Sequence, residues 1–174
     1  MRVVFKNMVV HPQQVQRAHL AGCAAGKQGR FLDFYRAFWD QAYKPYAEQH
    51  DMTKLGEENV MAIATTLGLD VTKLKADMDG KECAQLLETD EAELQKFGVN
   101  GTPAFFINGT FIGGGIPKEA FHKIIDEQLK TFAASGVPAE QFYTTQIMGK
   151  GLKKFRSAKD AKKAAQGAEA AGGH

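Results

Sequence analysis

The segment VNGTPAFFINGTFIGGG, residues 99–115, has the pattern of a proline-containing loop followed by a β-hairpin. Residues 104–107 form a continuous apolar run, which is typical of a strand buried on both faces. Asn108-Gly109 predicts a type I′ turn, because both central residues of that turn need a positive φ. Pro103 costs the sheet little at the start of a strand, since its missing N–H group falls at the end of the ladder.

Residues 98–109 (GVNGTPAFFING) resemble the cis-proline loop and the following hairpin of thioredoxin-fold proteins of the DsbA-like family. The resemblance extends over about residues 2–135. Residues 2–10 resemble the second strand of that family, the segment from Leu67 to Asp70 onward resembles its inserted helical segment, and Pro117 to about Leu129 resembles its closing helix.

The resemblance implies an α/β fold, with a thioredoxin-like sheet and an inserted helical segment at about residues 12–97. The whole domain is expected to occupy residues 1–148. The family's first strand and first helix, which carry a Cys-x-x-Cys pair, have no counterpart here, so we interpret the domain as truncated at its N-terminus.

The two cysteines, Cys23 and Cys83, do not have the pattern of a redox pair. A reactive thiol is expected at a helix N-terminus, where the helix dipole lowers its pKa. Cys23 falls in the middle of an expected helix, and Cys83 follows Glu82, whose negative charge raises a thiol pKa. We interpret Cys23 as a buried structural cysteine and Cys83 as a half-buried inert thiol, with a disulfide between them as the alternative. We therefore expect no catalytic residue in this chain.

By resemblance, the protein is a DsbA-like thiol–disulfide oxidoreductase whose redox pair lies outside this chain. Two alternatives are a non-catalytic module that binds peptides or a partner, and a structural module that self-associates. Thr102 and Pro103 are the candidate substrate-binding residues. A cis X-Pro bond turns the chain sharply, so the backbone of the preceding residue can pair with an extended peptide.

The partners implied by the resemblance are protein or peptide substrates at this loop, with no cofactor. The family also implies a periplasmic location. Residues 1–6 lack the pattern of a signal peptide, which leaves a cytoplasmic location open.

The composition is that of an ordinary globular protein, with 44% hydrophobic and 24% charged residues in a chain of 174. The net charge of +2 says nothing about partners. We expect no nucleic-acid partner, because no aromatic residues are interleaved with the basic residues of the C-terminal tail. No apolar run approaches the ~18 residues that a membrane-spanning helix needs. His19 and Cys23 lie four residues apart on one helix face, but structural zinc requires four ligands and only His11 is close in sequence, so we expect no metal site.

The remaining segments are expected to be mostly helical, apart from a strand over residues 2–7. Aromatic residues recur every three or four positions in residues 31–43, which predicts an amphipathic helix with its aromatic stripe in the core. Residues 44–50 are expected to form a polar loop. The other helices are expected at residues 12–26, 54–67, 70–78, 81–97, 117–132 and 138–148. From Gly149 onward, Lys, Ala and Gly predominate, which predicts a basic, disordered tail over residues 149–174.

The absent first strand leaves two apolar strand edges, at residues 2–7 and 104–107, that a soluble protein must protect. The strand of residues 2–7 could pair directly with the hairpin, which would give a three-stranded sheet in a monomer. Two copies could instead complete each other's sheet. We favour a homodimer, with Val3, Phe5, Phe105 and Ile107 near the contact, because two-fold dimers are the commonest way to cover such a patch.

Overall fold

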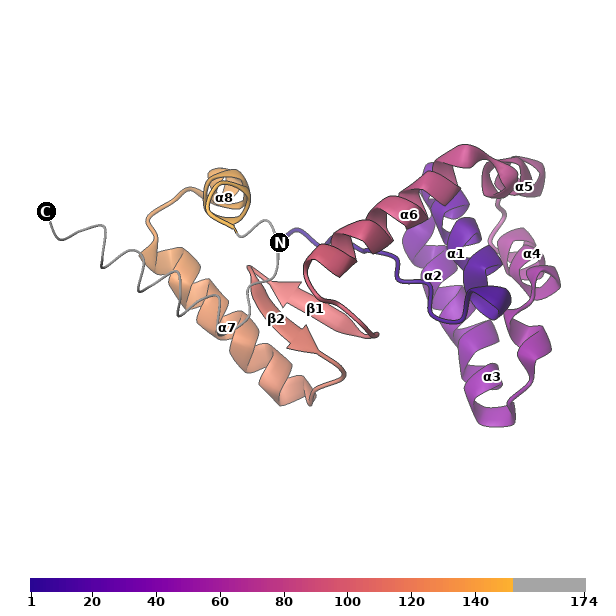
Figure 1. Ribbon diagram of the computed structural model, residues 1–174, viewed down its shortest axis with the longest axis horizontal. Coiled ribbons are helices and arrows are strands. Elements are labelled where there is room, and N and C mark those ends of the chain that lie inside the picture. The colour runs from indigo at the N-terminus through magenta and orange to yellow at the C-terminus, as the bar shows by residue number, and fades with distance from the viewer. Residues whose placement is uncertain (152–174) are drawn as a thin grey trace, which may run out of the picture. The chain divides into compact units, whose positions relative to one another are not determined.

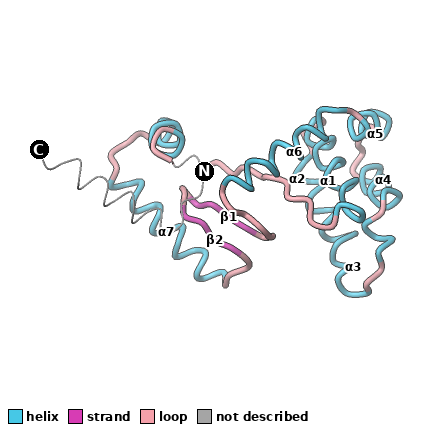
Figure 2. Tube along the Cα trace, in the orientation of Figure 1, coloured by secondary structure: helices cyan, strands magenta, loops and turns pink. Residues whose placement is uncertain are grey.

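The computed structural model describes residues 1–151, which form two compact units that meet in the sequence between Leu94 and Gln95 (Figure 1). Each unit has its own set of elements. The first is made of helices, whereas the second contains a β-hairpin and further helices (Figure 2). The expected tail, apart from residues 149–151, lies outside the described residues.

The first unit is built from six α-helices and two short helical turns. In chain order they are α1 (Pro12–Lys27), α2 (Phe31–Phe38), the π-helical turn η1 (Trp39–Tyr43), α3 (Lys44–Gln49), the 3-10 turn η2 (Met52–Leu55), α4 (Glu57–Thr66), α5 (Val71–Asp79) and α6 (Lys81–Lys96). The core is formed where small residues of α1 meet larger ones from the other helices. Ala21, Ala24 and Ala25 are fully buried, and so are Val60 of α4 and Leu74 of α5.

Local sequence explains most of these helix boundaries. Pro12 opens α1 at a position where its missing N–H group is not needed. Asp70 caps α5, because its side chain accepts a hydrogen bond of 2.9 Å from the backbone N–H of Lys73. Gly68 follows α4 with a φ of 70°, a left-handed conformation that glycine adopts without strain. The helices expected from these signals are confirmed.

The second unit contains β1 (Ala104–Ile107), β2 (Thr110–Gly113), α7 (Lys118–Ala134), α8 (Ala139–Phe142) and the π-helical turn η3 (Tyr143–Met148). The two strands pair antiparallel, with Ile107 opposite Thr110. Asn108 and Gly109 have φ values of 47° and 91°, so the expected turn with two positive φ angles is confirmed. Helix α7 packs on the hairpin through Phe121, whose ring centre lies 5.1 Å from that of Phe105.

The prediction of a strand over residues 2–7 is wrong, because this segment is a loop that pairs with no strand of residues 1–151 (Figure 2). In residues 1–151 the sheet consists of β1 and β2 alone, so the three-stranded alternative is not formed either. Side chains hold the segment instead. The Phe5 ring lies 5.1 Å from that of Phe31 and 5.7 Å from that of Tyr35. A strand requires a neighbouring edge, which an apolar sequence alone does not provide.

Two helical expectations also need correction. Residues 44–49 form α3 rather than a loop, because the backbone continues without a break from η1 and Pro45 occupies the first turn. The aromatic stripe is only partly in the core. Phe34 is buried, whereas Tyr35 and Trp39 are almost half exposed. Aromatic residues therefore lie on more than one face of α2.

Candidate functional site

The loop of residues 101–103 leads directly into β1 and is exposed at all three positions. The Thr102–Pro103 peptide bond is cis. The carbonyl oxygen of Pro103 accepts a hydrogen bond of 2.8 Å from the backbone N–H of Gly114, which extends the hairpin ladder by one pair. Within residues 1–151, no hydrogen bond engages the backbone of Thr102. The loop therefore presents an unpaired peptide group next to the sheet.

The register of the hairpin determines which backbone groups of β1 face away from β2. Hydrogen-bonded and non-hydrogen-bonded pairs alternate along an antiparallel ladder. Because Pro103 bonds to Gly114, the next pair, Ala104 with Gly113, is a non-hydrogen-bonded pair. Its N–H and C=O groups point outward, as do those of Phe106. No other strand of the described chain occupies this outer edge of β1.

The side chains of β1 are more exposed than the apolar sequence predicts. Phe105 is 37% exposed and Phe106 is 45% exposed, so the expectation of a strand buried on both faces is wrong. Phe105 packs against α7, while Phe106 lies 5.0 Å from Phe111 and 5.7 Å from Phe97, measured between ring centres. Both rings remain exposed because the hairpin has only two strands, so no further strand of the sheet covers their sides.

The two cysteines form a disulfide, so the alternative of a Cys23–Cys83 pair is confirmed and the interpretation of Cys83 as an inert thiol is wrong. Cys23 of α1 and Cys83 of α6 lie 60 residues apart in sequence, with their Cα atoms 5.7 Å apart. Cys83 is fully buried rather than half-buried, whereas Cys23, which was expected to be buried, is only partly buried. The pairing follows from the packing of two helices, which spacing in the sequence does not reveal. Neither sulfur lies at an exposed helix N-terminus.

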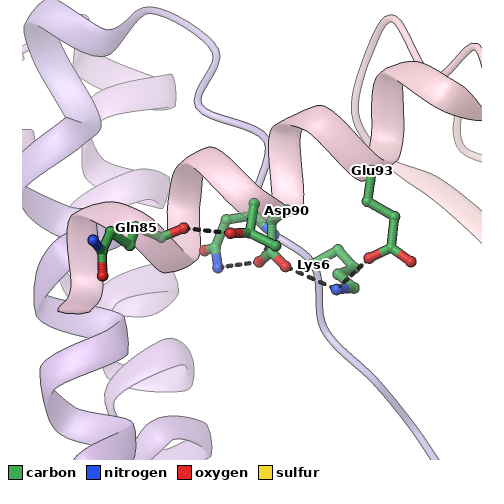
Figure 3. Close-up of polar contacts among 6 residues, drawn as sticks. Lys6, Gln85, Asp90 and Glu93 are labelled. Carbon is green, nitrogen blue, oxygen red and sulfur yellow. Dashed lines mark hydrogen bonds and ion pairs between the residues drawn. The ribbon is translucent and has the colours of Figure 1, made fainter.

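Sequence analysis did not identify Asp90, a buried acidic residue in the middle of α6 that is 2% exposed. Its carboxylate accepts hydrogen bonds of 2.9 Å from Lys6 Nζ, from the backbone N–H of Asn7 and from Asn7 Nδ2. Lys6 Nζ also lies 2.7 Å from Glu93 (Figure 3). Asp90 therefore anchors the N-terminal segment to α6. A sequence signal existed, because Asp90 falls at helical spacing from Leu87 and Leu94 on the apolar side of the helix.

The polar contacts around Asp90 shift several pKa values. Burial acts to raise the pKa of Asp90, but the hydrogen bonds from Asn7 and Lys6 outweigh it and lower the pKa below its ordinary value. The pKa of Lys6 is raised by its bonds to Glu93 and Asp90. His19 lies 3.1 Å from Asn7, between Nδ1 and Oδ1, and burial lowers its pKa. The hydrogen bonds therefore favour the ionised form of Asp90, and burial favours the neutral form of His19.

The bonding of Cys23 decides whether it can act as a metal ligand. Cys23 is bonded to Cys83, so it is not a partner for His19 in metal binding. Residues 1–151 contain no group of three or more His, Cys, Asp or Glu side chains suited to a metal ion. Over the same residues, no helix is both long and apolar enough to cross a membrane.

Comparison with known proteins gives one family match and one relative. The family described as DSBA-like thioredoxin domain matches residues 2–126. The Na(+)/H(+) antiporter NhaA of Herminiimonas arsenicoxydans is 27% identical over 142 residues, which cover 80% of this chain and 21% of the antiporter. The chain thus spans about a fifth of the length of this curated relative. No solved structure matches the chain significantly.

Proposed function

Because the chain belongs to the DSBA-like thioredoxin domain family, we propose that it takes part in thiol–disulfide exchange by binding extended segments of protein substrates. The binding site is the loop of residues 101–103 together with the outer edge of β1. In this proposal Thr102 and Pro103 bind substrate, and the redox thiols are not supplied by this chain.

The observation that carries the proposal is the row of unpaired backbone groups at Thr102, Ala104 and Phe106. An extended peptide that adds to a sheet edge gains main-chain hydrogen bonds from alternate residues of that edge. These three residues have that alternate spacing. The exposed ring of Phe106 lies beside the edge and would contact apolar side chains of the peptide.

The state of the cysteines supports a binding role rather than a catalytic one for this chain. Thiol–disulfide exchange begins when an accessible thiolate attacks a disulfide sulfur. Here Cys83 is fully buried and is bonded to Cys23. No free thiol is therefore present within the described residues.

A periplasmic location belongs to the same proposal. Proteins of the DsbA-like family are typically periplasmic. The disulfide between Cys23 and Cys83 supports this location, since structural disulfides form and persist in oxidising compartments and are rare in the cytosol. The proposal does not extend to the antiport activity in the name of the curated relative, because the matched region covers only 21% of that protein.

The proposal is tested by removing one outward-facing N–H group from either edge of the hairpin. Ala104→Pro removes it from the outer edge of β1, and Gly113→Pro removes it from the outer edge of β2. Binding is measured by fluorescence anisotropy with a fluorescein-labelled ten-residue peptide rich in Val and Thr. We expect Ala104→Pro to weaken binding at least tenfold and Gly113→Pro to change it less than twofold. Equal binding by both variants and the wild type would contradict the proposal, provided that their circular dichroism spectra match.

A further inference from the structure

A row of apolar side chains lies exposed along α2, η1 and α3 of the first unit. Four of its members are between 40% and 47% exposed: Leu32, Tyr35, Trp39 and Tyr43. Tyr46 continues the row, since its ring centre lies 6.1 Å from that of Tyr43, which in turn stacks on Trp39 at 4.6 Å. We call these five residues the exposed stripe.

The area of the stripe is large for an exposed surface of a monomer. An aromatic side chain has roughly 200 Å² of surface, so exposed fractions near 45% leave about 90 Å² for each residue. Phe5 is 46% exposed and its ring lies 5.7 Å from that of Tyr35, which extends the patch. Leu32, Tyr35, Trp39, Tyr43 and Phe5 together expose about 450 Å². This area is in the range of the largest exposed apolar patches on monomers, which are often functional.

We propose that the exposed stripe is the surface through which two copies of this chain associate around a two-fold axis. The order of its residues supports a second copy as the occupant. The steps from Leu32 to Tyr46 are three, four, four and three residues, so the stripe has the same spacing in both directions. Two antiparallel copies therefore place Trp39 against Trp39, Tyr35 against Tyr43, and Leu32 against Tyr46. An interface of this kind uses one patch on both partners.

The charges beside the stripe have the same self-complementarity. Arg36 and Asp40 line a hollow of about 260 Å³ together with Tyr35 and Trp39, so both charges flank the same side of the stripe. In the antiparallel arrangement, Arg36 of one copy lies two residues along the helix from the level of Asp40 of the other, an offset of about 3 Å that the long arginine side chain can span. Asp40 already accepts a bond of 2.6 Å from Lys44. Arg36 has no ion-pair partner anywhere in residues 1–151 and is free to pair with a second copy.

The oligomeric state is measured by light scattering after size exclusion, with the full chain at 1–200 µM. We expect the mass to rise with concentration from 19.0 kDa toward twice that value. Trp39→Ala should weaken the dimer at least tenfold, because aromatic residues at the centre of an interface contribute most to binding. Phe111→Ala is the matched control, since Phe111 is equally exposed, at 44%, but lies on β2. A mass of 19.0 kDa at every concentration would overturn the proposal, and so would a dimer that Trp39→Ala leaves intact.

Charge exchange tests the two-fold geometry directly. Arg36→Asp alone places two acidic residues at each contact between copies, and Asp40→Arg alone places two basic residues there. Each variant should therefore be largely monomeric. In a mixture of the two variants, both contacts of the heterodimer pair an acidic residue with a basic one, so association should return. A mixture that stays monomeric while the wild type dimerises would overturn the antiparallel arrangement.

Discussion

Replacing Cys23 and Cys83 with alanine removes the covalent link between α1 and α6. The two residues close a loop of 60 residues. For a loop of that length, the chain-entropy relation gives about 14 cal/mol/K, or about 4 kcal/mol at 25 °C. Small domains have a total unfolding free energy of about 5–15 kcal/mol, so this change is a large fraction of the whole. With a urea m-value of about 1.5–2 kcal/mol/M, the unfolding midpoint should fall by roughly 2–3 M.

The fluorescence of Trp39 provides the assay, because this is the one tryptophan of the chain and it lies in the helical unit. Urea unfolding is compared for the oxidised wild type, the wild type reduced with a phosphine, and the double alanine variant, all at 1 µM. The reduced wild type should match the double variant. The reductant should have no effect on the variant, which controls for its action elsewhere. If the oxidised and reduced wild types unfold within 0.3 M urea of each other, the disulfide does not stabilise the unit as argued.

Three further predictions concern the buried polar groups and the cysteines. Asp90→Asn should lower the unfolding free energy by about 2 kcal/mol at pH 7, through the loss of charge-assisted hydrogen bonds from Lys6 and Asn7. Because the pKa of Asp90 is lowered in the folded protein, this contribution is present above the ordinary carboxyl pKa and is lost as the pH falls through the folded pKa. The difference in urea unfolding between Asp90→Asn and the wild type should therefore shrink steadily as the pH is lowered from 5. Burial lowers the pKa of His19, so the wild type should lose stability as the pH falls from 7 to 5, and His19→Gln should flatten that slope in thermal unfolding measured across this range. In glutathione-coupled insulin reduction, turnover by the wild type should equal that of a double Cys→Ser variant, and clear turnover above that level would show an accessible redox thiol.

The elements that the sequence predicted well are those whose cause is local. A capping side chain at Asp70, a proline at Pro12 and an Asn108-Gly109 turn act over a few residues, so their effects can be recognised without tertiary structure. The strand expected over residues 2–7 failed for the opposite reason. A strand depends on an edge elsewhere in the chain, and this segment is held by Asp90 of α6 instead. The disulfide between Cys23 and Cys83 likewise depends on how two distant helices pack.

The candidate site shows the same division between local and distant causes. The sequence indicated the loop at Thr102 and Pro103, because a proline before an apolar strand and a turn is a local pattern. It did not indicate which backbone groups of β1 face outward, since this follows from the bond between Pro103 and Gly114. The register therefore turns a general expectation about the loop into specific positions, such as Ala104, that can be tested.

Helix α2 and the turn η1 show why an apolar pattern can predict a helix correctly and still misplace its side chains. Apolar residues in this segment occupy more than one face, so the pattern alone does not determine which face enters the core. Phe34 and Ala42 are buried, while Tyr35 and Trp39 remain exposed on the outer side. A second contact would bury that outer face as well. This is the physical reason for assigning the stripe to an interface rather than to the core of the monomer.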